Sequence, residues 1–372
     1  LRENSDRLSV RVFDLEARIR KTLPVMRANS NERNFQMKLS DIIKNVPHTL
    51  CGDGECEISG IELNSSMCGD GSLFVCLRGA RTDGHKYAAD AYSRGCRAFL
   101  CDHRLDLGDG VCEVVCADTR AALASVSAEF YGNPAKKLRI IGITGTKGKT
   151  TTSLMTAAIL NGAGIPCAYI GSNGVMIKDR HIDTVNTTPE SLELHHYFRL
   201  MADAGVDTVA MEVSSQALAH HRVDGIDFEV TAFLNLSEDH IGEGEHPDFE
   251  DYFASKLRIF SQAAAACVNL DCDHADRVLE AARKSCPRMI TFSQKDPSAT
   301  IFGSQVRKVG GDILFRVKTP RYSREFRLTM PGLFNVQNAL AALAVCEAVG
   351  VPEQYAFAGL MKARVPGRME VY

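Results

Sequence analysis

The chain has 372 residues, of which 45% are hydrophobic and 24% charged, and its formal net charge is -3. This length exceeds what one compact core usually holds, so two domains are expected. The small net charge gives no reason to expect nucleic acid or an anionic membrane as a partner. No apolar run approaches the roughly 20 residues that span a bilayer, and residues 1–20 contain no signal-peptide core. We therefore expect a cytoplasmic protein without a membrane partner.

Thirteen cysteines are scattered along the chain, and no two form a C-x-x-C pair. Cys112 and Cys116 are an even number of residues apart in an apolar run, as residues on one face of a strand would be. This usage favours buried, reduced thiols over a cysteine zinc site or a disulfide framework.

The first part of the chain is expected to hold an extension and then a domain. Residues 1–36 read as a charged helix and a polar stretch without a core of their own, whereas Met37 begins a more ordinary protein start. Over residues 37–135, β-like runs alternate with helical ones, which predicts an α/β layered domain. Gly132-Asn133-Pro134 breaks the pattern and marks the boundary. The expected strands are 72–77 and 98–101, and the expected helices are 87–94 and 119–131.

A second domain is expected over residues 136–366. It begins with a buried strand at 138–144, a glycine-rich turn and a helix at 151–160. The alternation that follows predicts a doubly wound, mostly parallel sheet, whose ligands bind at the carboxyl ends of the strands. A hairpin is expected over 309–329, with Gly310-Gly311-Asp312 as its turn. The further expected elements are strands 208–211, 230–234 and 266–269 and helices 249–260 and 335–349.

The strongest chemical signal is the run Gly145-Thr146-Lys147-Gly148-Lys149-Thr150-Thr151, between the first strand of this domain and its helix. Its backbone N–H groups and the helix N-terminus can hold phosphates. Lys149 would reach the β- and γ-phosphates, and Thr150 would offer its hydroxyl to Mg²⁺. Ile143 stands where the strict P-loop pattern has glycine. The strand and helix on either side favour a phosphate site over an ordinary glycine-rich turn.

Three more polar residues allow a chemical and an ordinary structural interpretation. Glu212 follows the strand 208–211, where a carboxylate can bind Mg²⁺ or belong to a capped helix start. His240 could bind a metal or relay a proton, although a loop histidine usually does neither. Lys256 flanks the apolar face of the helix 249–260, and this spacing alone favours a surface lysine.

Several other histidines also suggest a metal site. His195 and His196 are adjacent, as are His220 and His221, and neighbouring residues point to different sides of a helix. We therefore interpret most of these, together with His246, as surface groups or as neighbours of a site. His274 is interpreted as a surface residue.

Taken together, these residues resemble the Mur ligase family over about residues 37–370. In the first domain, Asn64-Ser65-Ser66, Gly69–Val75 and Gly79 with Asp83-Gly84-His85 are similar to the family's UDP-binding domain. The family commonly has Asp-Ser-Arg at the first of these places, so Ser65 is the position that matches. The resemblance implies that Ser65 contacts the nucleotide-sugar substrate.

In the second domain the P-loop resembles that of the family, with Lys147 where asparagine is usual. Asn186-Thr187-Thr188-Pro189 resembles the segment that holds the muramoyl-peptide end in the branch that adds the third amino acid. The resemblance further implies that Ser214 and Arg222 contact this substrate and that Glu212 binds Mg²⁺.

The remaining motifs imply a second metal position and the nucleotide contacts. Asn235–His240 resembles the family's Mg²⁺-binding histidine block, and Tyr252–Leu257 resembles the block whose lysine, here Lys256, is carbamylated by CO₂. The carbamate would be an anionic oxygen ligand, and its formation requires an unprotonated amine. Asn335 and Asn338 match the block that contacts adenine, and Arg368 matches the residue of the following hinge that meets the nucleotide.

The implied activity is the ATP-dependent formation of an amide bond. The terminal carboxylate of UDP-MurNAc-L-Ala-D-Glu attacks the γ-phosphate, and the amine of an amino acid then attacks the acyl phosphate. ATP, Mg²⁺ and the Lys256 carbamate are the implied cofactors. The dipeptide precursor and an amino acid are the implied partners of an expected monomer. The amino acid is usually meso-diaminopimelate or L-lysine, and the sequence does not assign it.

Two alternatives remain open at this point. The family has a third domain after the hinge, and residues 367–372 are expected to be the stub of that hinge. The chain could therefore be a truncated, non-catalytic nucleotide-binding module. It could also be a relative with another acyl acceptor, such as a cyanophycin-type or polyglutamate ligase, although Asn186–Pro189 speaks against this.

Overall fold

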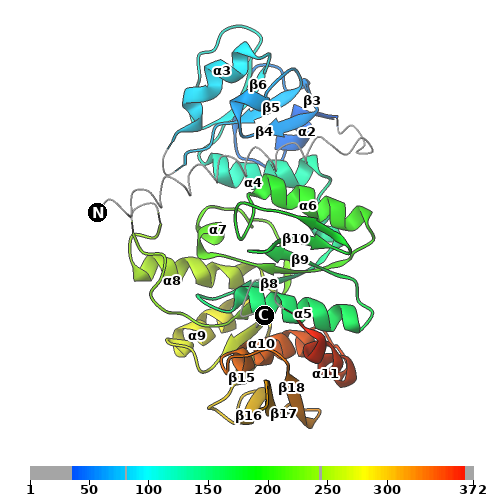
Figure 1. Ribbon diagram of the computed structural model, residues 1–372. Coiled ribbons are helices and arrows are strands. Elements are labelled where there is room, and N and C mark those ends of the chain that lie inside the picture. The colour runs from blue at the N-terminus through cyan, green and yellow to red at the C-terminus, as the bar shows by residue number, and fades with distance from the viewer. Residues whose placement is uncertain (1–35, 80–81, 243–244, 365–372) are drawn as a thin grey trace, which may run out of the picture.

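The structure is a computed structural model that describes residues 36–79, 82–242 and 245–364. The predictions for residues 1–35, for the hinge stub and for Arg368 lie outside the described residues. Two main sheets lie one above the other, each with its own hydrophobic clusters (Figure 1). Within the described ranges, no helix combines the length and apolarity that crossing a membrane requires.

The first sheet has five strands in the order β2-β7-β6-β5-β4, all parallel to their neighbours except β2. Helices cover both of its faces, which is why β5 and β6 are buried along their whole length. The strands are β2 (Thr49–Cys51), β4 (Gly60–Glu62), β5 (Ser72–Val75), β6 (Ala98–Cys101) and β7 (Cys112–Val115). A separate antiparallel pair joins β1 (Met37–Lys38) with β3 (Glu57–Ile58).

The helices of this domain follow the predicted positions with small shifts. α2 (Leu39–Ile43) and α4 (Thr119–Phe130) pack on one face, and α3 (Ala88–Ser93) packs on the other. The helix expected at 87–94 is preceded by the short helix η2 (Gly84–Tyr87). Both Cys112 and Cys116 are buried in the cluster beneath α4, as their even spacing predicts.

The second sheet has eleven strands in the order β11-β10-β9-β12-β8-β13-β14-β15-β16-β17-β18. The strands from β9 to β16 in this order pair in parallel, and antiparallel strands extend both edges. The strands are β8 (Arg139–Thr144), β9 (Cys167–Gly171), β10 (Gly174–Ile177), β11 (Arg180–Ile182), β12 (Thr208–Glu212), β13 (Phe228–Phe233), β14 (Ala265–Asn269), β15 (Arg288–Ser293), β16 (Ile301–Val309), β17 (Asp312–Lys318) and β18 (Ser323–Leu328).

Helices lie on both faces of this sheet, so the predicted doubly wound, mostly parallel architecture is confirmed. Ile141 and Ile143 on β8 point to one core, and Ile140 points to the other, as alternation along a strand requires. The first core contains α5 (Lys149–Gly162), α10 (Asn335–Ala348) and α11 (Glu353–Lys362). The second contains α6 (Ser191–Asp203), α7 (Ser215–Ala219), α8 (Phe249–Leu257) and α9 (Ala275–Ser285).

Two elements differ from their predicted form. The expected hairpin is part of a three-stranded antiparallel unit, β16-β17-β18, with Gly310 and Gly311 between β16 and β17 as predicted. The helix expected at 249–260 ends at Leu257 and continues as the short helix η4 (Arg258–Gln262).

The two sheets are joined through α4 and α6, which pack against each other (Figure 1). Leu192 on α6 is buried in the cluster that belongs to the first sheet. Arg120 on α4 lies 3.4 Å from the carboxylate of Glu190, the N-cap residue of α6. The contact therefore combines apolar burial with an ion pair.

Candidate active site

The glycine-rich loop lies where the sequence predicts it, between the end of β8 and the start of α5. In the sheet, β8 is flanked by β12 and β13. Because neighbouring parallel strands end at the same edge, Glu212 at the end of β12 and the segment after β13 lie beside the loop. This edge gathers most of the predicted site residues.

Glu212 is a buried carboxylate that several groups hold in place. Thr150 Oγ1 donates to Glu212 Oε2 at 3.1 Å, and Tyr169 OH and Ser172 N donate to Oε1 at 2.7 and 2.9 Å. Gly171 makes room for this arrangement, because a Cβ there would lie 2.1 Å from Oε1. The Thr150 and Glu212 oxygens are hard donors side by side, the chemistry that Mg²⁺ prefers.

The segment predicted to hold the substrate meets the same glutamate. Thr188 Oγ1 donates to the backbone oxygen of Glu212 at 2.9 Å, and Ser214 N donates to Thr188 Oγ1 at 3.1 Å. Thr187 Oγ1 lies 3.0 Å from Ser172 Oγ, and Arg222 Nη1 donates to Thr188 O at 3.2 Å. Asn186 is half-buried in this loop. Folding therefore brings Thr187, Thr188, Ser214 and Arg222 close to Glu212, whose carboxylate lies beside the phosphate loop.

Two lysines converge on the backbone oxygen of Gly145. Lys149 Nζ donates to it at 2.8 Å, and Lys256 Nζ does so at 3.1 Å. Lys256 is 1% exposed, and its Nζ lies 4.6 Å from the centre of the Tyr252 ring. The interpretation of Lys256 as a surface lysine, based on spacing alone, is therefore wrong. Its side chain extends from α8 under the phosphate loop.

This environment favours the neutral amine of Lys256. Burial lowers the pKa of Lys256 well below its ordinary value, and the nearby Lys149 cation lowers it further, while Asp239 acts in the opposite direction. An ammonium without a close carboxylate is costly in such surroundings. A buried, unprotonated amine is the form that CO₂ can modify.

The segment after β13 holds the other side of the loop. Thr146 N donates to Asn235 O at 3.1 Å, and Lys147 N donates to Asn235 Oδ1 at 2.8 Å. Lys147 Nζ lies 3.0 Å from Asp239 Oδ2, and this hydrogen bond lowers the pKa of Asp239. Thr146 Oγ1 also lies 3.0 Å from the hydroxyl of Tyr252 on α8. The loop is thus positioned before any ligand arrives.

The predicted adenine residues also lie beside the loop. Asn338 Nδ2 donates to Asn335 Oδ1 at 2.9 Å, and Asn335 Nδ2 donates to Pro331 O at 2.7 Å. A Cβ at Gly148 would lie only 2.3 Å from Asn338 Oδ1. Thr151 is buried in the first turn of α5. Hence α10 abuts the phosphate loop.

Two predicted residues are not gathered with the rest. The side chain of His240 is 47% exposed, with Nδ1 3.2 Å from Glu245 Oε1 and the ring centre 6.2 Å from that of Tyr252. No described contact joins it to Lys256. Ser65 lies in the first domain, in the short helix η1 (Ser65–Met67), where it is buried.

His246 lies beside the predicted substrate residues, which agrees with the second of its two interpretations, a neighbour of a site. It is 3% exposed, with Nε2 2.9 Å from Ser215 Oγ and Nδ1 2.6 Å from Asp251 Oδ2. His195 and His196 are buried as well, so of the two interpretations made from the sequence, surface group or neighbour of a site, the first is wrong for these three histidines. Ser215 directly follows Ser214, but no local pattern connects it to a histidine 31 residues later. His274 is exposed, as predicted.

The fold and the loop place this protein among the P-loop α/β proteins. Residues 143–346 match the family model of the Mur ligase middle domain, and residues 57–131 match that of the Mur ligase family catalytic domain. Together with the relatives below, these matches show that the chain belongs to the Mur ligase family, which confirms the resemblance found in the sequence.

Relatives and solved structures agree with this assignment. The UDP-N-acetylmuramoyl-L-alanyl-D-glutamate–2,6-diaminopimelate ligase of Caldanaerobacter subterraneus subsp. tengcongensis is 37% identical over 90% of this chain and 68% of its own length. A solved structure of a ligase with the same name aligns with a TM-score of 0.79 at 27% identity, covering 91% of this chain and 69% of the other. The MurF structure from Acinetobacter baumannii, at 24% identity and a TM-score of 0.66, shares the fold over 90% of this chain and 70% of its own.

Proposed function

We propose that this protein is the ATP-dependent ligase, or part of it, that adds the third amino acid to UDP-MurNAc-L-Ala-D-Glu during peptidoglycan biosynthesis. One observation carries the proposal: Glu212 bonds Thr150 of the phosphate loop through its side chain and Thr188 of the substrate segment through its backbone. A single buried residue thus connects the loop proposed to hold the nucleotide with the segment proposed to hold the substrate. The names of the relatives make 2,6-diaminopimelate the amino acid to test first.

The nucleotide would bind along the edge formed by β8, α5 and α10. The backbone of residues 145–148 and the side chains of Lys149, Thr150 and Thr151 would contact the phosphates. Asn338, which adjoins Gly148, and Asn335, which accepts a hydrogen bond from Asn338, would face the adenine end. Arg368 is proposed to meet the nucleotide from the hinge, outside the described residues.

The proposed substrate contacts come from both domains. Ser65 would contact the nucleotide end of UDP-MurNAc-dipeptide in the first domain. Near the phosphate loop, the muramoyl-peptide end would meet Asn186, Thr187, Thr188, Ser214 and Arg222. Arg222 has a further partner that suits this role, because its Nε lies 2.5 Å from the carboxylate of Glu190, which orients the guanidinium.

Mg²⁺ ions fit the donor set of this edge. Thr150 and Glu212 would hold one ion, and His240 with a carbamate on Lys256 would hold a second, after His240 turns inward from its present exposed position. When bound, Mg²⁺ supplies positive charge next to the phosphoryl group.

The reaction would proceed by positioning and charge stabilisation. The terminal carboxylate of the dipeptide attacks the γ-phosphorus of ATP, and ADP leaves with the electrons of the broken bond. The amine of the amino acid then attacks the acyl phosphate, phosphate leaves, and the amine loses a proton. Lys149 would stabilise the negative charge of the transferring group. The proposal requires no covalent intermediate with a side chain. We expect the protein to be a monomer and to work in the cytoplasm, where ATP is available.

Calorimetry tests the substrate assignment directly. We expect UDP-MurNAc-L-Ala-D-Glu to bind in the presence of Mg²⁺ and a non-hydrolysable ATP analogue, and UDP-GlcNAc to bind at least about tenfold more weakly, which is about 1.4 kcal/mol. Binding of the analogue without the dipeptide precursor would indicate a ligase with another acyl acceptor. Binding of neither ligand would reject the proposed site.

Lys256 provides a second test that does not require turnover. With ¹³C-labelled bicarbonate at slightly alkaline pH, we expect one ¹³C carbamate resonance in the wild-type chain and none in Lys256→Ala. The matched control, Lys147→Ala, removes an exposed lysine from the same edge and should keep the resonance. A wild-type spectrum without a carbamate, or a resonance that persists in Lys256→Ala, would refute the carbamate.

A further inference from the structure

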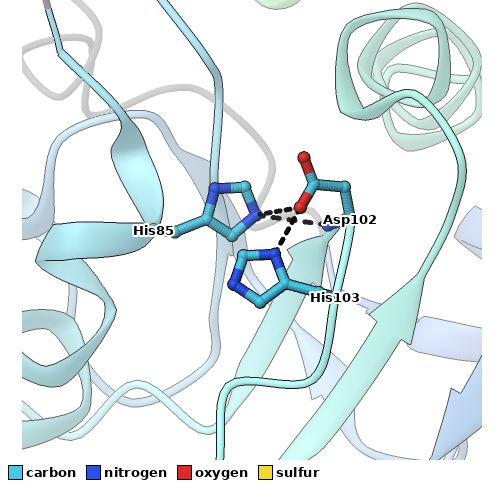
Figure 2. Close-up of side chains that lie close together, drawn as sticks. All are labelled: His85, Asp102 and His103. Carbon is cyan, nitrogen blue, oxygen red and sulfur yellow. Dashed lines mark hydrogen bonds and ion pairs between the residues drawn. The ribbon is translucent and has the colours of Figure 1, made fainter.

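A group of potential metal ligands lies in the first domain, separate from the phosphate loop. His85 belongs to η2, and Asp102 and His103 directly follow β6. One ligand atom from each of the three lies within 4.8 Å of the others. Figure 2 shows that both imidazole rings direct a nitrogen toward the same carboxylate oxygen. This convergence of nitrogen and oxygen donors has no part in the proposed ligase reaction.

His85 is oriented in the way that metal-binding histidines usually are. Its Nδ1 lies 2.6 Å from Asp83 Oδ1, and its side chain is only 6% exposed. A carboxylate that accepts the Nδ1–H fixes the tautomer and leaves the lone pair on Nε2. That Nε2 lies 3.2 Å from Asp102 Oδ1 and 3.2 Å from the backbone N of Asp102. The Nε2 lone pair therefore accepts a hydrogen bond from the Asp102 N–H and lies beside a carboxylate oxygen, so a bound metal ion would replace this hydrogen bond.

Asp102 Oδ1 and the lone pair of His85 Nε2 are both acceptors and lie 3.2 Å apart, so a cation that replaces the Asp102 N–H at Nε2 would be stabilised by both. His103 presents Nδ1 to the same Asp102 Oδ1 at 2.5 Å, and its ring stacks on that of His85 with centroids 4.5 Å apart. A proton can be shared at these contacts. A metal ion would engage all three donors at once.

Arg78 is the cation that competes for this carboxylate. Its Nε lies 2.5 Å from Asp102 Oδ2, and its Nη2 lies 3.1 Å from Oδ1. The Arg78 side chain is 63% exposed, so Nη2 can withdraw from Oδ1 while Nε keeps Oδ2. Arg78 should thus weaken binding of a metal ion without blocking it.

We propose that His85 Nε2, Asp102 Oδ1 and His103 Nδ1 form a binding site for one borderline divalent cation, with Zn²⁺ as the best fit. Two imidazole nitrogens and one carboxylate oxygen suit Zn²⁺, whereas Mg²⁺ prefers oxygen donors alone. The fourth position is open to water on the side of His103, whose side chain is 55% exposed. The ion would tie η2 to the carboxyl end of β6.

The test is a titration of the reduced chain with Co²⁺, a spectroscopic substitute for Zn²⁺, in excess Mg²⁺ and ATP analogue. We expect one Co²⁺ per chain with visible absorption typical of nitrogen and oxygen ligands and without the intense bands of thiolate ligands. Competition with a chromophoric chelator then gives the Zn²⁺ affinity. His103→Ala and Asp102→Asn should each weaken it at least about tenfold, and Asp83→Asn by about 10–100-fold through the orientation of His85.

Matched variants separate the metal site from general effects. His48→Ala removes a histidine of the same domain whose Nδ1 lies 2.7 Å from Val46 O, and it should bind like wild type. Arg78→Met should bind several-fold more tightly. Far-ultraviolet circular dichroism identifies any variant that fails to fold. Equal Zn²⁺ affinity in wild type, His103→Ala and His48→Ala would show that the cluster is only a hydrogen-bond network. This result would not depend on whether the ligase proposal is correct.

Discussion

At the scale of the residue, Gly148 marks the point where the phosphate loop and α10 meet. It has a φ of +86°, which non-glycine residues rarely adopt, and no room for a side chain beside Asn338. The loop and the predicted adenine residue are therefore packed in direct contact. Any side chain at this position must displace one of them.

We predict that Gly148→Ala lowers the affinity for a non-hydrolysable ATP analogue at least about tenfold, because the new Cβ pushes the loop away from Asn338. Gly164→Ala is the control, since Gly164 also has a positive φ, +77°, but open space around its Cβ. Gly164→Ala should cost about 1 kcal/mol of stability and leave the affinity for the ATP analogue unchanged. Calorimetry on both variants measures the difference, and equal affinities would contradict the prediction.

Single residues also show where reasoning from spacing fails. Lys256 flanks the apolar face of its helix and reads as a surface lysine, yet its amine is buried against Gly145 O. Periodicity along α8 carries no information about a loop 111 residues earlier in the chain. The similarity of its sequence block to the family, unlike its spacing, assigned it to the site.

At the scale of the element, α6 carries two buried histidines. In the described structure neither ring nitrogen of His195 has a hydrogen-bond partner, and burial lowers the pKa of His195 and of His196 to about 4 from an ordinary 6.5. Between these pH values the unfolded chain binds more protons than the folded one. Stability is therefore complete above about pH 6.5 and falls as the pH decreases toward 4.

We predict that the unfolding free energy falls by about 3 kcal/mol per histidine over this range, since one pKa unit corresponds to about 1.36 kcal/mol. His195→Leu should remove roughly half of this loss, because leucine cannot be protonated. His274→Leu, at an exposed position outside α6, should leave the pH dependence unchanged. Urea unfolding at a series of pH values tests both. If His195→Leu left the pH dependence of the unfolding free energy unchanged, His195 would not be buried as described.

At the scale of the whole molecule, α6 is the element that contributes to the hydrophobic clusters of both sheets. Leu192 packs in the cluster of the first sheet, and Leu194, two residues later, packs in a cluster of the second. The ion pair between Arg120 and Glu190 lies at the start of the same helix. The docking of the two domains thus depends on one helix with two apolar faces.

We predict that Leu192→Ala and Leu194→Ala each cost about 2–5 kcal/mol of stability, but in different places. Hydrogen exchange should increase around α4 and the first sheet for Leu192→Ala, and around the second sheet for Leu194→Ala, because each truncation opens a cavity in a different core. Mass spectrometry of peptides from each domain measures this. The same exchange pattern for both variants would show that the clusters of the two sheets unfold as one unit.

The sequence by itself determined the alternation of strands and helices, the mostly parallel second sheet, the phosphate loop and the family. These depend on local periodicity and on contiguous motifs, which the order of residues contains directly. Only the tertiary structure decided which side chains meet: Lys149 with Lys256 at Gly145 O, and Thr150 with Thr188 through Glu212. It also decided the burial of His195 and His246 and the meeting of His85 with Asp102, because such contacts join distant segments at strand ends and depend on strand order.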